Sequence, residues 1–364
     1  MHGVIMLEHL NITNLLYIYE NEISKNVKNK KKLYNFEINK MQYIENIISM
    51  LKKCYIGHEE YNIFLIYEPK CRLVMSLSVR DKLINHFVTR YILEANLSKE
   101  LDHRNVATRK GMSTDYAIKL VLKYINTLKR KYENIYVLKL DISKYFYTID
   151  HEVLKDEIKG KLDSFDYDVI CKIIDSTNKE YINNIISKYK EKGIDIPLYE
   201  NGKGLPIGNM TSQFLSIYYL NRLDHFIVHD LHLKYYCRYM DDFIIFSNDL
   251  KYLKKCKDII IEKLEKEYKL KVNTKKTWIC NLAEGFSFLG YTCKKVGNKT
   301  IIKIKRSNVE KFKKRIKEVR YLYDTEKISI YSAFCSIMTY TNSYKYSDNK
   351  KILKLIDRYW YHEK

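Results

Sequence analysis

Apolar and polar positions in the first third of this chain predict mainly helices, interrupted by a pair of short strands. Apolar positions recur every three or four residues in a helix and alternate in a half-buried strand. On this basis residues 1–55 are expected to be helical around a solvated basic loop. The expected elements are the loop Lys25–Lys32, strands Tyr61–Tyr67 and Leu73–Leu77, and helices at Val79–Ala95 and from Thr114 onward.

The rest of the chain predicts a mixture of strands and helices. Ile135–Leu140 is a nearly unbroken apolar strand that ends at Asp141, and a carboxylate in such a place is more often functional than one in a loop. The glycine-rich loop Gly202–Asn209 precedes a helix that Thr211 or Ser212 can cap. The other expected elements are helices over 151–190, the helix Gln213–His229, an amphipathic helix marked by Leu250, Leu253, Ile260, Leu264 and Tyr268, strands Leu270–Asn273, Phe286–Cys293 and Thr300–Lys305, and basic helices near the C-terminus. This order predicts an α+β fold with helical flanks.

The most informative stretch is Tyr239-Met240-Asp241-Asp242, which lies between two largely apolar runs rich in β-branched and aromatic residues. Its short polar centre predicts the tip of a β-hairpin. Taken alone, the Asp pair favours an ordinary turn, because turns are rich in Asp. Adjacent carboxylates in an apolar setting repel each other and lose solvation, however, and Mg²⁺ is a natural partner for carboxylate oxygens. If folding brings Asp141 beside this pair, the carboxylates can hold two ions roughly 3.5–4 Å apart, as nucleotidyl transfer requires.

The net charge of the chain indicates what kind of molecule it binds. Lys and Arg outnumber Asp and Glu by 65 to 44, which gives the 364 residues a formal net charge of +21 and a pI near 9.3. This excess favours a polyanionic partner, with nucleic acid ahead of an anionic membrane. No run approaches the length of a membrane span and the N-terminus lacks signal-peptide features, so we expect a cytoplasmic protein with no membrane partner. The eight scattered cysteines are expected to be reduced thiols rather than a zinc site or a disulfide framework.

Ordered blocks along the chain resemble the motifs of reverse transcriptases. They are EPKCRLV, SVRDKLINHFV, ATRKGMSTDYA, LKLDISKYF, GLPIGNMTSQFLSIYYLNRLD, YYCRYMDDFIIFS, LKVNTKKT and FSFLGYT, roughly over residues 35–300. The resemblance implies a right-hand polymerase with an antiparallel palm sheet and a helical thumb. Within the family, IGNMTSQ, the RKG segment and the short chain are most similar to enzymes of diversity-generating retroelements and related unclassified or defence-associated bacterial groups. The implied segments are an N-terminal helical segment at 1–55, fingers at 56–134, a palm at 135–295 with a fingers insertion at 151–200, and a thumb at 296–364.

The resemblance also implies a catalytic set. The metal ligands would be the carboxylates of Asp141, Asp241 and Asp242, of which Asp242 is the weaker candidate, and the backbone carbonyl of Ile142. Lys276 would be a general acid near the leaving pyrophosphate, with Lys275 as its competitor. The ion would be Mg²⁺, with Mn²⁺ as a substitute.

Further residues are implied in substrate binding. Phe146 would be the aromatic gate that excludes a ribose 2′-hydroxyl, although it also fits a plain core position. The other nucleotide-binding candidates are Lys70, Arg72, Arg109, Ile142, Ile207 and Gly208, and the primer and template candidates are Tyr239, Lys110 and Gln213. For the basic residues, a solvated surface charge is the alternative, and for Tyr239 it is packing within the hairpin.

The implied function is RNA-directed DNA synthesis on an RNA template, from a DNA or RNA primer and dNTPs. Many relatives carry Gln after the Pro of the LPxG loop, where this chain has Ile207, and relatives in diversity-generating retroelements carry an aliphatic residue and make errors at adenines. Low fidelity in such a retroelement is therefore expected, with a small basic accessory protein or a co-encoded non-coding RNA as candidate partners. The alternatives are an antiviral-defence enzyme, protein-primed or template-independent synthesis, and a maturase-like RNA-binding scaffold.

Overall fold

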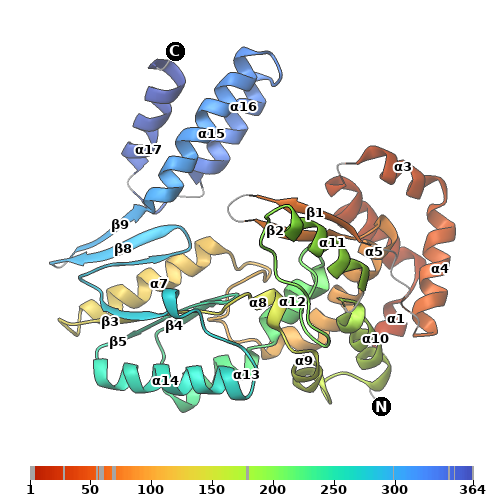
Figure 1. Ribbon diagram of the computed structural model, residues 1–364, viewed down its shortest axis with the longest axis horizontal. Coiled ribbons are helices and arrows are strands. Elements are labelled where there is room, and N and C mark those ends of the chain that lie inside the picture. Colours follow the sequence, from red (N-terminus) through yellow and green to blue (C-terminus); the bar gives the residue numbers. More distant parts are fainter. Residues whose placement is uncertain are drawn as a thin grey trace. The chain divides into compact units, whose positions relative to one another are not determined.

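The computed structural model describes residues 5–27, 29–54, 56, 61–67, 71–177, 180–297, 299–342, 345–347 and 349–362. These residues belong to two compact units (Figure 1). The first unit contains residues 1–108, 141–232 and 258–273, and the second contains 109–140, 233–257 and 274–364. Each unit therefore brings together segments that are distant in sequence.

The first unit is mainly helical and contains one small antiparallel sheet. This sheet pairs β1 (Asn62–Ile66) with β2 (Arg72–Ser76). The α-helices are α1 (Ile5–His9), α2 (Ile12–Ile18), α3 (Lys30–Ile38), α4 (Lys40–Lys52), α5 (Val79–Val88), α6 (Ala95–Leu97), α8 (Tyr145–Thr148), α9 (His151–Ile158), α10 (Ser164–Ile174), α11 (Glu180–Glu191), α12 (Met210–Tyr218) and α13 (Asn221–His225). Short π-helical or 3₁₀ turns lie at Tyr19–Ile23, Ser24–Asn26, Thr89–Glu94, Ser98–Glu100, Asp175–Thr177 and Phe226–Asp230. Several helices begin at a side chain that accepts a hydrogen bond from a backbone N–H of the first turn: Asn11, Asn29, Ser78, Asp150 and Asp163.

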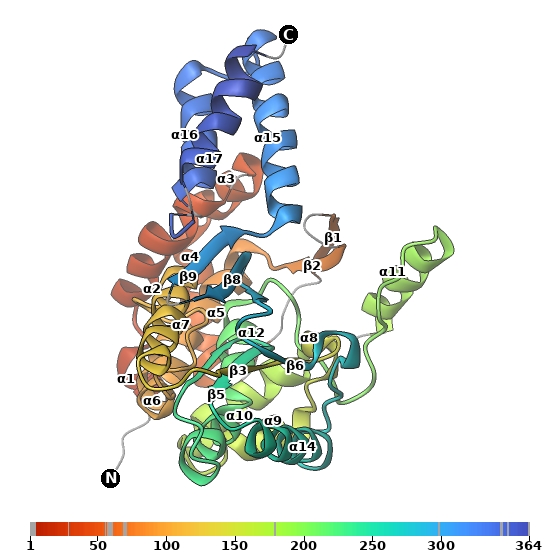
Figure 2. The ribbon, with the colours of Figure 1, turned by 90° about the vertical axis from the view of Figure 1, so that its left-hand side faces the viewer.

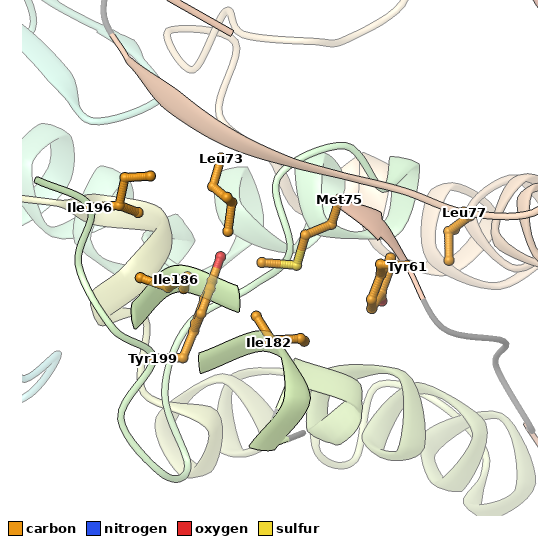
Figure 3. Close-up of a cluster of buried hydrophobic side chains, with 8 residues drawn as sticks. All are labelled: Tyr61, Leu73, Met75, Leu77, Ile182, Ile186, Ile196 and Tyr199. Atoms are coloured by element: carbon orange, nitrogen blue, oxygen red, sulfur yellow. The ribbon is translucent and has the colours of Figure 1, made fainter. Parts of the chain in front are cut away.

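A buried apolar cluster joins the sheet of the first unit to α11 (Figure 3). Leu73 and Met75 project from one face of β2, because side chains two residues apart on a strand share a face. They belong to the same cluster as Ile182 and Ile186 of α11 and Tyr199, which follows that helix. Since Tyr199 lies just before the glycine-rich loop, this packing helps to position the loop relative to β2.

The second unit contains two sheets. In one the strand order is β4-β5-β3-β6, and β4 pairs with β5, and β3 with β6, in antiparallel fashion. In the other the order is β7-β8-β9, again antiparallel. The strands are β3 (Tyr136–Asp141), β4 (Tyr236–Tyr239), β5 (Asp242–Ser247), β6 (Trp278–Asn281), β7 (Phe286–Phe288), β8 (Tyr291–Val296) and β9 (Lys299–Ile304). Helix α7 (Thr114–Lys129) starts at the capping residue Ser113, and α14 (Leu250–Lys266) begins in this unit and ends in the first.

The C-terminal part of the second unit is a small helical bundle. In Figure 2, α15 (Arg306–Asp324), α16 (Ile330–Asn342) and α17 (Asn349–Ile356) lie side by side, and a π-helical turn follows at Asp357–His362. Their shared core contains Phe312, Ile316, Val319, Ala333, Ile337, Ile352 and Trp360. One basic side chain of α15 has partners within this part of the chain: Arg320 donates to the carbonyl of Trp360 and forms an ion pair with Asp324.

All eight cysteines are free thiols, as the sequence predicts. Burial raises the pKa of the Cys293 thiol to about 12, so this thiol stays protonated at neutral pH. Among the described residues, no helix combines the length and the apolar character needed to cross a bilayer.

Most of the predicted elements are present, but some boundaries are wrong. The basic run Lys25–Lys32 is not simply a loop, because α3 starts at Lys30 after the capping residue Asn29. The helix expected at Gln213–His229 begins at Met210 instead, and it divides into α12, α13 and a π-helical turn. Neither Thr211 nor Ser212 caps it, because Asn209 occupies the cap position.

The strands after α14 also differ from the prediction. Leu270–Asn273 is extended but forms only an isolated bridge, between Val272 and Ile142. The strand expected at Phe286–Cys293 is a hairpin, since Leu289 and Gly290 turn the chain with φ of +46° and +86°. Strand β6 was not predicted, and it acquires its strand character by pairing with β3.

Candidate active site

The YMDD stretch forms the predicted hairpin tip. Tyr239 of β4 lies opposite Asp242 of β5, which leaves Met240 and Asp241 as a two-residue loop. Met240 has a φ of +57°, and such loops favour a positive φ because it matches the twist of the strands. Arg238 has no solvent exposure and donates from Nη1 to the Met240 carbonyl oxygen at 2.9 Å. The buried guanidinium therefore holds the turn that carries both carboxylates.

Strand β3 is the neighbour of β5 in the sheet. The ammonium of Lys139 on β3 lies 2.5 Å from Oδ1 of Asp242, so this end of β3 lies beside the first residue of β5. Two residues further on, β3 ends at Asp141, which is 9 % exposed. Asp141 thus occupies the strand end at which the sequence predicted it.

Ile142, which follows Asp141, is expected to offer its backbone carbonyl to a metal ion. The Asn273 N–H donates to the Asp141 carbonyl and the Ser143 N–H donates to the Lys271 carbonyl, both at 2.8 Å. These bonds flank the bridge between Ile142 and Val272, which makes that bridge a non-hydrogen-bonded pair. The carbonyl of Ile142 consequently points away from the 271–273 segment.

In the first unit, the glycine-rich loop lies directly against β2. The Met75 N–H donates to the Ile207 carbonyl oxygen at 2.8 Å. Gly208 has a φ of +126°, and a Cβ at this position would lie 2.6 Å from the Met75 carbonyl oxygen. Glycine is needed here because any side chain would both strain the backbone and push the loop off the strand.

The other side of this loop is bonded to the segment that follows Asp141. The Leu205 N–H donates to the carbonyl of Phe146 and the Gly204 N–H donates to that of Ile149, both at 2.7 Å. Phe146 and Tyr147 are both partly exposed, and Tyr147 packs against the apolar cluster of β2 and α11, where burial raises the pKa of its hydroxyl to about 12. The backbone of the gate candidate is therefore fixed to the loop that carries Ile207 and Gly208.

The basic residues expected to bind the nucleotide or the template do not all belong to the same unit. Arg72 is the first residue of β2 and is exposed, and Lys70 lies outside the described residues. Arg109 is partly exposed and Lys110 is exposed, in a turn closed by a bond from the Met112 N–H to the Arg109 carbonyl. The first unit therefore brings Phe146, Ile207, Gly208 and the strand of Arg72 around one loop, whereas Arg109 and Lys110 belong to the second unit.

Three further candidates lie on helices or on the hairpin. Gln213 is exposed on α12 although the residues around it, from Thr211 to Asn221, are otherwise buried. Lys276 is partly exposed in a 3₁₀ turn, where Lys275 is more exposed. Tyr239 is partly buried at the end of β4, and burial raises the pKa of its hydroxyl.

A second group of potential metal ligands contains none of the three motif carboxylates. Side-chain ligand atoms of Asp102, His225 and His229 lie within 4.8 Å of one another. However, Arg104 Nη1 lies 3.1 and 2.9 Å from the two carboxylate oxygens of Asp102. A guanidinium this close would repel a divalent cation, so we regard Asp102 as the partner of Arg104 and assign no metal to this group.

Three residues of structural importance were not identified from the sequence. Lys139 and Arg238 are the charged residues in otherwise apolar stretches, a pattern that signals a buried partner without saying which one. Asn209 is fully buried and donates from Nδ2 to the Tyr61 hydroxyl at 3.0 Å, which ties the end of the glycine-rich loop to the start of β1. Its sequence signal is only that of an ordinary loop residue.

Comparison with known proteins identifies the family. Residues 67–293 match the family described as reverse transcriptase (RNA-dependent DNA polymerase), and this is well over half of the chain. The chain belongs to the reverse transcriptase family. No curated protein sequence matches it.

Solved structures of telomerase resemble the fold. Apo telomerase from Candida tropicalis has a TM-score of 0.52 at 16% identity, covering 86% of this chain and 59% of that one. Apo telomerase from Candida tropicalis without its C-terminal domain has a TM-score of 0.48 at 17% identity, covering 67% of this chain and 55% of that one. Candida albicans telomerase in complex with a TWJ fragment of telomeric RNA has a TM-score of 0.48 at 14% identity, covering 85% of this chain and 64% of that one. The chain thus spans between 55% and 64% of the length of these chains. The predicted class, an α+β reverse transcriptase fold with antiparallel sheets, is confirmed.

Proposed function

We propose that this chain is an RNA-directed DNA polymerase that extends a DNA or RNA primer with dNTPs on an RNA template. The observation that carries this proposal is a hairpin tip with two adjacent carboxylates, next to a strand that ends in a third, Asp141. Family membership supports it, because the family is defined by this activity. The excess of positive charge favours binding of the nucleic acid backbone.

The donor set fits magnesium, since the carboxylates of Asp141 and Asp241, with that of Asp242 as the weaker candidate, and the carbonyl of Ile142 all offer hard oxygen atoms. Bound Mg²⁺, or Mn²⁺ in its place, would lower the pKa of the primer 3′-hydroxyl and stabilise the charge of the leaving pyrophosphate. The protein supplies the positioning. Arg238 holds the turn, and the Ile142 carbonyl points away from the 271–273 segment because its bridge with Val272 is a non-hydrogen-bonded pair. Lys276 would donate a proton to the pyrophosphate, with Lys275 as the alternative donor.

The nucleotide would bind at the loop that β2 and the 146–151 segment hold between them. Arg72 and Lys70 would bind the triphosphate, where a guanidinium can bond two phosphate oxygens at once. Phe146 would block a ribose 2′-hydroxyl, because its backbone is bonded to Leu205 and cannot easily retreat. Ile207 and Gly208 would lie beneath the sugar and base.

The primer and template would contact other parts of the chain. Tyr239 would lie against the primer end, and Gln213 would meet the nucleic acid, which agrees with its exposure on a buried helix. Arg109 and Lys110 would bind phosphates. In this proposal the fingers, palm and thumb correspond to 56–134, 135–295 and 296–364, with the N-terminal helices at 1–55 and the fingers insertion at 151–200.

A narrower proposal concerns fidelity and setting. Ile207 has an apolar side chain in the loop beside the nucleotide, so it cannot hydrogen-bond a base or sugar. We expect error-prone copying, as in a diversity-generating retroelement, rather than the synthesis of an antiviral-defence enzyme. Replacing Ile207→Gln should change the error spectrum of the cDNA, with Ile207→Leu as the apolar control. An unchanged error spectrum in Ile207→Gln would mean that the side chain at position 207 does not determine the copying errors.

Primer extension tests the main proposal. The full chain is supplied with an RNA template, a primer, dNTPs and Mg²⁺, and is compared with Asp241→Asn and with Asp168→Asn, an exposed acid on α10. Metal-dependent, templated DNA from the wild type and Asp168→Asn, but not from Asp241→Asn, is expected. Failure of the wild type to make DNA, even with co-encoded RNA and protein present, would favour an RNA-binding scaffold, and synthesis without template would favour a template-independent enzyme.

A further inference from the structure

The ion pair between Lys139 and Asp242 is largely shielded from solvent. The side chains are 12 % and 24 % exposed, and the charged atoms lie 2.5 Å apart. The ammonium also lies 5.1 Å from the centroid of the Phe288 ring on β7, and Phe288 is 1 % exposed. One lysine thus links β3, the catalytic hairpin and the adjacent sheet.

This environment ties Lys139 to Asp242. An ammonium with little access to water is costly unless a carboxylate neutralises it, and the ring face adds a weaker attraction that also requires the ammonium to stay in place. Lys139 and Asp141 share a face of β3, because they are two residues apart on the strand. The positive charge therefore lies on the side of the strand that carries a proposed metal ligand.

We propose that Lys139 is a positioning residue that takes the Asp242 carboxylate as its own counter-ion, so that Asp241 is the metal ligand of the hairpin and Asp242 is not. This inference rests on the proposed function and divides the two adjacent carboxylates between two tasks. Asp242 anchors the first residue of β5 to β3, and Asp241, on the turn, is the hairpin carboxylate that meets the metal. Lys139 also neutralises the Asp242 carboxylate, so that this carboxylate does not strengthen the binding of the divalent ion.

Binding of Mn²⁺ to the full chain, followed by the electron paramagnetic resonance signal of the free ion, tests this without measuring activity. The decisive variant is the double change Lys139→Met with Asp242→Asn, which removes the pair without changing the net charge. Replacing a buried ion pair by groups of similar size is usually tolerated, so this variant should fold. If Asp242 is only a counter-ion, the double variant binds Mn²⁺ within about threefold of wild type, whereas Asp241→Asn loses binding by well over tenfold.

Single variants complete the test. Lys139→Met should bind Mn²⁺ about tenfold more tightly, because the freed Asp242 can join the ligands, and Lys139→Arg should restore the wild-type affinity. Lys119→Met, which removes an exposed lysine paired with Asp115 at 3.4 Å, should change nothing.

Two outcomes would contradict different claims. Loss of binding in the double variant equal to that in Asp241→Asn would overturn the proposal, because Asp242 would then be a ligand. Absence of any Asp241-dependent Mn²⁺ binding in the wild type would instead contradict the proposed function itself.

Discussion

Replacing Gly208→Ala should damage nucleotide binding far more than an ordinary glycine substitution in the same loop. A Cβ at position 208 would lie 2.6 Å from the Met75 carbonyl oxygen, a backbone atom of β2 that cannot rotate away. To relieve this clash, the loop would have to separate from β2. That separation would break the hydrogen bond between the Met75 N–H and the Ile207 carbonyl. The strained φ of +126° costs about 1–2 kcal/mol and the lost bond about 1 kcal/mol, for a total of about 2–3 kcal/mol.

Gly202→Ala is the matched control. Gly202 also has a positive φ, +69°, but a Cβ at this position would have no atom within 4 Å. The substitution should therefore cost only the backbone term of about 1 kcal/mol. In steady-state single-nucleotide incorporation, kcat/KM for the dNTP should fall about 100-fold in Gly208→Ala and less than tenfold in Gly202→Ala. Equal losses in the two variants would mean that the close approach of Gly208 to β2 has no effect on nucleotide binding.

Three further predictions concern the gate, the hairpin and a buried acid. Phe146→Val should raise the ratio of rNTP to dNTP incorporation by at least about tenfold, and an unchanged ratio would mean that Phe146 is a core residue. Arg238→Met should lower the free energy of unfolding in urea by about 3 kcal/mol, because the Met240 carbonyl loses a buried charged donor, and a loss below about 1 kcal/mol would contradict this role. Burial, with the neighbouring Asp163, raises the pKa of Asp166 from 3.8 to about 7. The folded state therefore holds this proton more tightly than the unfolded state, so stability should fall as the pH rises from about 4 to 7, by about 2–3 kcal/mol between pH 5 and 8, and Asp166→Asn should remove that part of the fall in urea titrations.

Local patterns in the sequence predict the catalytic hairpin and the strand before it. The residues flanking Asp241 and Asp242 are apolar and β-forming, and the run before Asp141 is long enough to be read as a buried strand. Both elements are present with nearly the expected bounds. Strand β6, by contrast, is short and half-buried, and it exists as a strand because it pairs with β3, about which its own residues carry no information.

Pairings across long stretches of chain could not be predicted. A lysine in the apolar run before Asp141 indicates a carboxylate partner, but nothing local selects Asp242, which lies 103 residues away. In the same way, a glycine-rich loop indicates a turn, but only the structure shows that Gly208 touches the backbone of Met75. Motif resemblance supplied candidate roles for these regions, whereas the contacts that hold them in place depend on the tertiary fold.

The most direct measurement is the location of Mn²⁺ in crystals of the full chain with primer, template and a non-hydrolysable nucleotide, from anomalous scattering. We expect manganese bound by carboxylate oxygens of both Asp141 and Asp241. Manganese found only elsewhere, for example at Asp102, His225 and His229, with the carboxylates of Asp141 and Asp241 directed apart, would contradict it.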